Sequence, residues 1–308
     1  MSKEQFRTSI GGQALIEGVM MRGPEKTAMA VRLPSNEIDV ETWKEKPLKW
    51  YNKAPFLRGS INFVTTMIMG YKTLMRSAEK SGFDDTEELS SFDKKMMNFF
   101  GDKFWGVIMA VAGILASIIA VVLFTIFPSF IGGLVTGNAA QGFLRSFVEG
   151  TVRILVFVVF VGLVSRTSDI KRVYQYHGAE HKSIACYESG EELTPENAKK
   201  CSRFHPRCGT NFIMISLIVS IVLFAVVEIN TAWLRVMLKL LLIPVIVGIS
   251  YEIIKFIGKR ENIITKIIAA PGMLLQRLTT AEPDEEQLEV AIAALKAAIP
   301  SNAGSDKY

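Results

Sequence analysis

Four long runs of apolar residues constrain the fold of this 308-residue chain more than any other feature. A helix needs about 20 predominantly apolar residues to cross the hydrocarbon core of a bilayer, and each run reaches or approaches that length. Because the runs contain few charges, they favour membrane spans over the buried core helices of a soluble protein. We therefore expect a mainly α-helical, polytopic membrane protein with four transmembrane helices. The runs are Phe104 to about Phe127, about Val148 to Val164, about Asn211 to Glu228, and about Trp233 to Ile257.

The distribution of Lys and Arg predicts how these spans are oriented. The segment from Arg166 to Gly209, between the second and third runs, holds eight basic residues, whereas the link between the first two runs has only Arg145. Basic residues accumulate in cytoplasmic loops, so segment 166–209 and both chain termini are expected in the cytoplasm, with the spans in the inner membrane. The N-terminus has no apolar signal-peptide core. The net charge of +5 suits anionic lipid headgroups, so the expected partner is the lipid bilayer and no nucleic acid is implied.

The remaining segments suggest six parts. In residues 1–54, alternating apolar residues on both sides of a turn at residues 34–37 predict a small cytoplasmic β-hairpin module. Residues 55–103 combine an interfacial helix, from Pro55 to Lys80, with a charged connector from Asp84 to Lys95. The other parts are 104–165 with spans one and two, 166–209 as a cytoplasmic loop, 210–258 with spans three and four, and 259–308 with cytoplasmic helices.

Two helices are expected in the C-terminal part. Residues 263–278, IITKIIAAPGMLLQRL, can lie along the membrane surface, with a break at Pro271–Gly272. The last helix is expected to begin at Pro283, followed by acidic residues that favour a helix start. Its apolar stripe predicts that it docks on another element, and consists of Leu288, Ile292, Leu295 and Ile299.

All three histidines and all three cysteines lie in one short window, between Tyr176 and Gly209. His177 and His181 are four positions apart, so on a helix both imidazoles share a face and can bind one metal ion. With Glu180 they form His-x-x-Glu-His, the inverted zinc-peptidase pattern, in which the glutamate polarises the attacking water. The reducing cytosol favours metal ligands or free thiols over disulfides. We therefore expect a divalent metal site, with zinc as the metal.

Seven residues are candidate ligands, more than one tetrahedral zinc ion takes: His177, His181, Cys186, Cys201, His205, Cys208 and Glu252. Glu252 is included because a carboxylate in an apolar segment is costly and usually paired or functional. In one division, the histidine pair and Glu252 form a catalytic site with Glu180 as general base, and the other four residues form a structural site. In another, the histidine pair, Cys201 and Cys208 form one closed structural site. The alternative to any metal site is surface histidines with packing cysteines.

Glu17 and Arg22 lie in the glycine-rich N-terminal segment, on the same expected side of the membrane as the metal site. They could therefore reach it. The alternative is a turn with ordinary surface charges.

Several segments carry a resemblance to a known family. They are GGQALIEGVMMRGP, FLRGSINF, HGAEHKSIACYE, CSRFHPRCGTNF, SYEIIK and PGMLLQRLTTAEPDEEQLEVAIAAL. In this order they resemble the YqhQ-like family of bacterial multi-pass membrane proteins, which bear a domain of unknown function and are described as predicted metal-dependent enzymes. The resemblance covers nearly the whole chain and implies a metal-dependent enzyme, with no settled substrate.

Three function classes follow. The first is a metal-dependent membrane hydrolase, peptidase-like, with its site at the cytoplasmic face. The second is a non-enzymatic membrane scaffold or assembly factor whose loop is held by structural zinc. The third is a transporter that uses Glu252, although the chain lacks the internal repeats typical of transporters.

Overall fold

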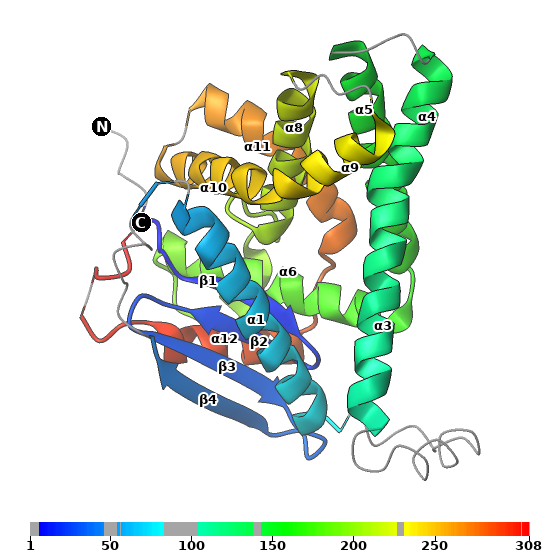
Figure 1. Ribbon diagram of the computed structural model, residues 1–308. Helices are drawn as coiled ribbons and strands as arrows, with labels where there is room; N and C mark the ends of the chain where they lie inside the picture. The colour runs from blue at the N-terminus through cyan, green and yellow to red at the C-terminus, as the bar shows by residue number, and fades with distance from the viewer. Residues whose placement is uncertain are drawn as a thin grey trace. The chain divides into compact units, whose positions relative to one another are not determined.

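The structure, a computed structural model, describes residues 6–45, 54–55, 57–82, 104–137, 143–226, 231–260, 262–302 and 304–307 (Figure 1). The chain forms two compact units. The first unit comprises Met1–Phe83, Phe160–Val219 and Ile243–Tyr308, and the second comprises Asp84–Val159 and Ser220–Leu242. The charged connector expected from Asp84 to Lys95 lies outside the described residues.

A four-stranded antiparallel sheet near the N-terminus organises the first unit. Its order is β1-β2-β3-β4, formed by β1 (Gly11–Leu15), β2 (Gly18–Arg22), β3 (Lys26–Arg32) and β4 (Ile38–Lys44). The expected hairpin is β3–β4, in which Arg32 pairs with Ile38. The glycine-rich segment adds a second hairpin, β1–β2, that the sequence analysis did not predict.

Both faces of this sheet are covered by helices, which explains why β3 is almost wholly buried. Alternate residues of the strands face opposite sides. On one side, Met29 packs in a cluster that also contains Leu74 of α1 (Leu57–Lys80). On the other side, Ala28 packs in a larger cluster with residues of α6 (Ser168–Ser189) and α12 (Glu285–Ala298). The docking predicted for the last helix is therefore present, since Leu288, Ile292 and Leu295 lie in this cluster.

The C-terminal helices differ from expectation in two details. Helix α12 begins after Asp284, whose side chain forms a capping box with Gln287, because an aspartate satisfies the free N–H groups better than Pro283 does. Helix α11 (Ile263–Thr279) is continuous through Pro271, so the expected break is wrong. The next residue, Gly272, packs so closely on Asn211 that an added Cβ would lie 1.6 Å from its Oδ1.

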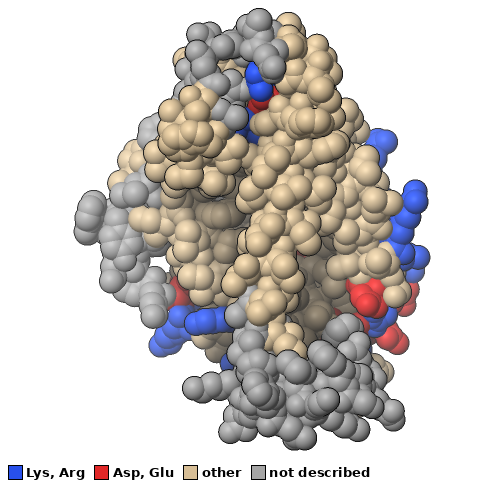
Figure 2. Space-filling model, turned by 45° about the vertical axis from the view of Figure 1, so that its right-hand side comes forward, with Lys and Arg blue, Asp and Glu red and all other residues tan. Residues whose placement is uncertain are grey.

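Three described helices are long and apolar enough to cross a membrane. They are the run Val111–Thr136, Phe143–Val164 (α5) and Gly209–Val226 (α8). The first run combines α3 (Phe104–Val121), the π-helix Val122–Ile126 and α4 (Phe127–Thr136), and it carries no charged residue. Its side chains form an uncharged surface in Figure 2. These helices indicate a membrane protein.

The fourth expected span is not confirmed as one helix. Residues 233–257 are divided between α9 (Ala232–Leu241) and α10 (Ile243–Lys259), with Leu242 between them. Pro244 accounts for the division, because proline lacks the N–H that would continue the helix and clashes with the preceding turn. Neither helix alone reaches the length of a span.

The second unit contains a buried group of charged side chains. Glu149 of α5 forms ion pairs with Arg145, one turn earlier, and with Lys239 of α9. The Lys239 ammonium also donates to Ser129 Oγ of α4 at 2.9 Å. One turn after Glu149, Arg153 donates to the carbonyl oxygen of Phe124 in the π-helix at 2.8 Å. These contacts connect α4, α5 and α9 inside an apolar unit.

Candidate metal centre

Helix α6 and the residue before α8 bring three donors together. His177 and His181 are one turn apart on α6, as the sequence predicted, and their ring centroids are 4.5 Å apart. Cys208 immediately precedes α8, and its Sγ lies 3.1 Å from His177 Nε2. One ligand atom from each of the three residues lies within 4.8 Å of the others. This spacing is suited to a single metal ion.

Hydrogen bonds to backbone carbonyls orient both imidazoles. His177 Nδ1 donates to the Thr279 oxygen at 2.8 Å, and His181 Nδ1 donates to the Arg203 oxygen at 2.6 Å. Because a carbonyl only accepts, Nδ1 of each ring donates outside the group, and Nε2 is the nitrogen available to an ion once any proton on it is displaced. Metal-binding histidines in proteins commonly have this arrangement.

The His181 Nε2 atom is buried and has no hydrogen-bond partner among the described residues. A buried polar atom without a partner is rare in folded proteins and needs an explanation. A metal ion bound by the three donors would provide one, so the residues fit such an ion.

The charges of the site stabilise the form of cysteine that binds metals. Burial raises the pKa of the Cys208 thiol, but the positive charges of His177 and His181 outweigh it and lower this pKa well below its usual value. Burial lowers the pKa of His177, but the Cys208 thiolate raises it to about 9. Since the thiolate is the metal ligand, the site is prepared for a cation.

Glu180 lies on α6 next to the three donors but is not one of them. It is 5% exposed, and its Oε1 accepts a hydrogen bond from the Gly12 N–H at 3.1 Å. Burial raises its pKa, although the charges of His177 and His181 oppose the shift. Its position beside the three candidate donors is the one that the sequence predicted for a general base.

Glu252 lies outside this group. Its carboxylate forms an ion pair with Arg58, whose Nε donates to Oε1 at 2.7 Å. This pair joins α10 to α1, because Glu252 lies on α10 and Arg58 near the start of α1. No local pattern indicates a pairing between residues this far apart in the chain.

Cys186 and Cys201 lie together but apart from Cys208. Cys186 Sγ donates to the Glu192 oxygen at 3.5 Å, and Cys201 Sγ donates to the Asn197 oxygen at 3.6 Å. Burial, with a further effect of Cys201, raises the pKa of the Cys186 thiol to about 11. This thiol is therefore protonated at neutral pH and unsuited to bind metal without a proton loss.

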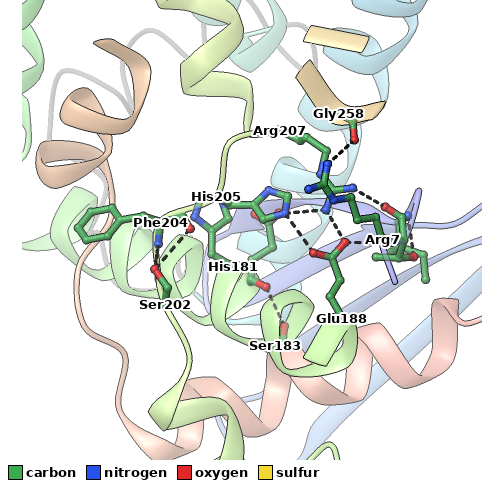
Figure 3. Close-up of polar contacts among 12 residues, drawn as sticks. Arg7, His181, Ser183, Glu188, Ser202, Phe204, His205, Arg207 and Gly258 are labelled. Carbon is green, nitrogen blue, oxygen red and sulfur yellow. Dashed lines mark hydrogen bonds and ion pairs between the residues drawn. The ribbon is translucent and has the colours of Figure 1, made fainter. Parts of the chain in front are cut away.

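His205 is near the site but is held by other groups (Figure 3). Its ring lies 5.5 Å from that of His181, and its Nε2 contacts the Arg207 guanidinium at 3.0 Å. Because a guanidinium only donates, Nε2 is the acceptor in this contact. Arg207 in turn forms an ion pair with Glu188 of α6. Burial, and then the surrounding positive charges, lower the pKa of His205, so this imidazole is neutral.

Three contributions to the site had no clear signal in the sequence. They are the Gly12 N–H, the Thr279 carbonyl and the Arg207–Glu188 ion pair, which anchors the loop before Cys208. The first two are backbone groups, which no residue type reveals, and the third is a pair of side chains 19 positions apart. Their roles can be found only from the tertiary structure.

Comparisons with known proteins agree with the resemblance seen in the sequence. A family described as "Protein of unknown function (DUF1385)" matches residues 54–301. The chain is 36% identical over 296 residues to the uncharacterised protein YqhQ of Bacillus subtilis (strain 168), covering 95% of this chain and 92% of the relative. No solved structure matches. The chain therefore belongs to the DUF1385 family.

Proposed function

We propose that this protein is a metal-dependent membrane hydrolase with a zinc site at the cytoplasmic face of the inner membrane. The observation that carries the proposal is the group of His177, His181 and Cys208, in which one buried imidazole nitrogen has no hydrogen-bond partner in the described parts of the chain. Two imidazoles and one thiolate form a donor set that suits zinc.

Three protein ligands, rather than four, favour catalysis over a structural role. Catalytic zinc sites in proteins have three protein ligands and an open fourth position, whereas structural sites are closed by four. When bound, zinc supplies a Lewis acid and an acidified water molecule. Glu180, beside the ligands, accepts a proton as general base. The carbonyls of Thr279 and Arg203 hold the two imidazoles in the required orientation.

The packing of the first unit supports a cytoplasmic location for both termini. The sheet precedes the first span, and α12 follows the last, yet Leu288 of α12 packs in one cluster with Val19 of β2. This packing supports a topology in which both ends of the chain lie on one side of the membrane and the number of crossings is even. We infer that α9 and α10 together form a broken fourth crossing. The basic segment 166–209 favours the cytoplasm as that shared side.

Elemental analysis and X-ray absorption of the purified protein test the proposal. We expect one zinc per chain, with two nitrogen ligands, one sulfur ligand and one oxygen ligand. Four protein donors would instead indicate a scaffold with structural zinc, and the absence of metal would refute both interpretations.

The second test is the variant Glu180→Gln, assayed for hydrolysis of peptide and ester substrates. It should retain zinc and lose activity by about 100-fold or more, because general-base catalysis contributes on that order. Glu192→Gln is the matched control, since Glu192 is exposed and its side chain has no part in the site. Equal activity of the wild type and Glu180→Gln would exclude this role for Glu180.

A further inference from the structure

Helix α6 presents two neighbouring rows of side chains. His177 and His181 form one row, which faces the donor Cys208. Arg172, Tyr176 and Glu180 form the other, at intervals of four residues, and all three contact the β1–β2 hairpin. The hairpin and the metal ligands are therefore held by adjacent faces of one helix.

Glu17, in the turn between β1 and β2, holds the tip of the hairpin against α6. Its carboxylate accepts from Arg172 Nη2 at 2.6 Å, and from Arg172 Nε. It also accepts from the hydroxyl of Tyr176, a fully buried residue, at 3.1 Å. One carboxylate thus joins the turn to two positions of the helix.

The backbone conformation of Glu17 is unusual for a residue that has a side chain. Its φ is 51°, in the left-handed region that residues with a Cβ seldom adopt. Glycine is the ordinary residue for such a turn position because it has no Cβ to crowd the backbone. The cost of this backbone conformation is therefore offset by the contacts of the Glu17 carboxylate with Arg172 and Tyr176.

Gly12, at the other end of β1, approaches Glu180 closely. Its N–H donates to Glu180 Oε1, and a Cβ at Gly12 would lie 2.7 Å from Glu180 Cγ and 2.8 Å from the Met20 oxygen. Because one of these neighbours is backbone, any larger residue must displace the strand or the Glu180 side chain. Only glycine permits the observed hydrogen bond.

From these contacts we propose that the β1–β2 hairpin is part of the active site, with Glu17 and Gly12 as positioning residues for the carboxylate of Glu180. The Glu17 contacts to Arg172 and Tyr176 fix the hairpin on α6, and the hairpin presents the Gly12 N–H to Glu180. This role rests on the proposed function. It assigns a task to a segment that precedes residues 54–301, the part matched by the family.

The test measures binding of acetohydroxamic acid to the Co²⁺-loaded protein by visible absorption. A hydroxamate chelates the metal and gives its proton to an adjacent carboxylate, so its Kd reports the position of Glu180 independently of any substrate. We expect Gly12→Ala and Glu17→Gly to raise this Kd by about tenfold or more, as loss of supporting contacts at metal sites does. Co²⁺ affinity should stay unchanged, because Gly12 and Glu17 are neither candidate ligands nor hydrogen-bond partners of the ligands.

Two variants separate positioning from a loss of folding. Glu17→Gly removes the backbone strain together with the carboxylate that offsets it, so its thermal midpoint should stay close to that of the wild type. Glu45→Gln is the control beside the same sheet, because Glu45 directly follows β4 and pairs with Arg22 at the end of β2. It should leave the hydroxamate Kd unchanged.

The outcomes distinguish this inference from the proposed function. An unchanged hydroxamate Kd in Glu17→Gly, with Co²⁺ bound, overturns the inference and leaves the metal site intact. The same loss of hydroxamate binding in Glu45→Gln also overturns it, since the effect would then be general to the sheet. Failure of the wild type to bind Co²⁺ refutes the proposed function itself. If Gly12→Ala does not fold, Glu17→Gly decides alone.

Discussion

The Nε2 atom of His177 lies 3.1 Å from the Sγ atom of Cys208, although 31 positions separate these residues in the chain. The contact joins the middle of α6 to the start of the membrane helix α8. The segment between them is fixed by Arg207, which pairs with Glu188, and by the carbonyl of Arg203, which accepts from His181. The site thus depends on one cysteine, and the other two cysteines are held elsewhere.

Substituting Cys208 should remove the metal, whereas substituting Cys186 should not. In Cys208→Ser we expect zinc affinity to fall by more than about 100-fold, because loss of a ligand exceeds the 10- to 100-fold cost of losing a supporting contact. Cys186→Ser and Cys201→Ser should bind zinc as the wild type does. Zinc content after dialysis against a weak chelator measures this. Equal zinc loss in all three variants would contradict the three-donor site.

Glu252→Gln should leave the zinc content unchanged. Its carboxylate is paired with Arg58, and both side chains are about one-fifth to one-quarter exposed, so the variant should lose stability but not metal. We expect a destabilisation of about 1 kcal/mol, because a partly exposed ion pair is worth little. Elemental analysis and a thermal midpoint on the same sample check both parts. Loss of zinc would restore Glu252 as a ligand.

The local part of the site could be predicted from the sequence, since it depends on helical periodicity. A spacing of four residues places His177 and His181 on one face of any helix, and Glu180 beside them. The choice of the third donor could not be predicted. Cys208 and Glu252 were equal candidates by chemistry, and the packing of α6, α8 and α10 decides which one approaches the histidines.

The elements that long apolar runs identify were predicted from the sequence. The elements that depend on a glycine or a proline were missed. Long apolar runs identify three membrane helices, but Pro244 divides the fourth run. The β1–β2 hairpin was missed because glycines 11, 12 and 18 leave little alternation of apolar side chains to detect. At Gly12, the reason for glycine is the approach of Glu180, a contact over 168 positions that no local pattern contains.

Both chain ends should be found in the cytoplasm. The packing of α12 on the N-terminal sheet favours an even number of crossings, and the basic residues of segment 166–209 favour the cytoplasmic side. A fluorescent protein fused after the C-terminus should fluoresce, and alkaline phosphatase fused there should be inactive. Truncated fusions ending after residue 230 should show the reverse pattern, because three crossings precede that point. Periplasmic activity of the full-length phosphatase fusion would contradict the broken fourth crossing.

Lys239 and Glu149 should be strongly coupled, because both side chains are at least nine-tenths buried in the second unit. Glu149→Gln leaves the Lys239 ammonium without its carboxylate, and we expect a loss of about 3 kcal/mol or more in the free energy of unfolding. Lys239→Met should cost less, because Glu149 keeps its ion pair with Arg145. In the double variant both charges are absent, so its cost should be smaller than the sum of the single costs by about 1 to 3 kcal/mol. Thermal unfolding in detergent, followed by tryptophan fluorescence, measures all three.

An exposed pair on the first unit provides the control for this cycle. Lys199 and Glu285 are both more than half exposed and form a comparable ion pair at 2.9 Å. Since solvent screens such a pair, Lys199→Gln should leave the free energy of unfolding unchanged. If the double variant lost as much free energy of unfolding as the two single variants together, the charges of Glu149 and Lys239 would be stabilised separately. The buried contact would then not be what holds α9 against α5.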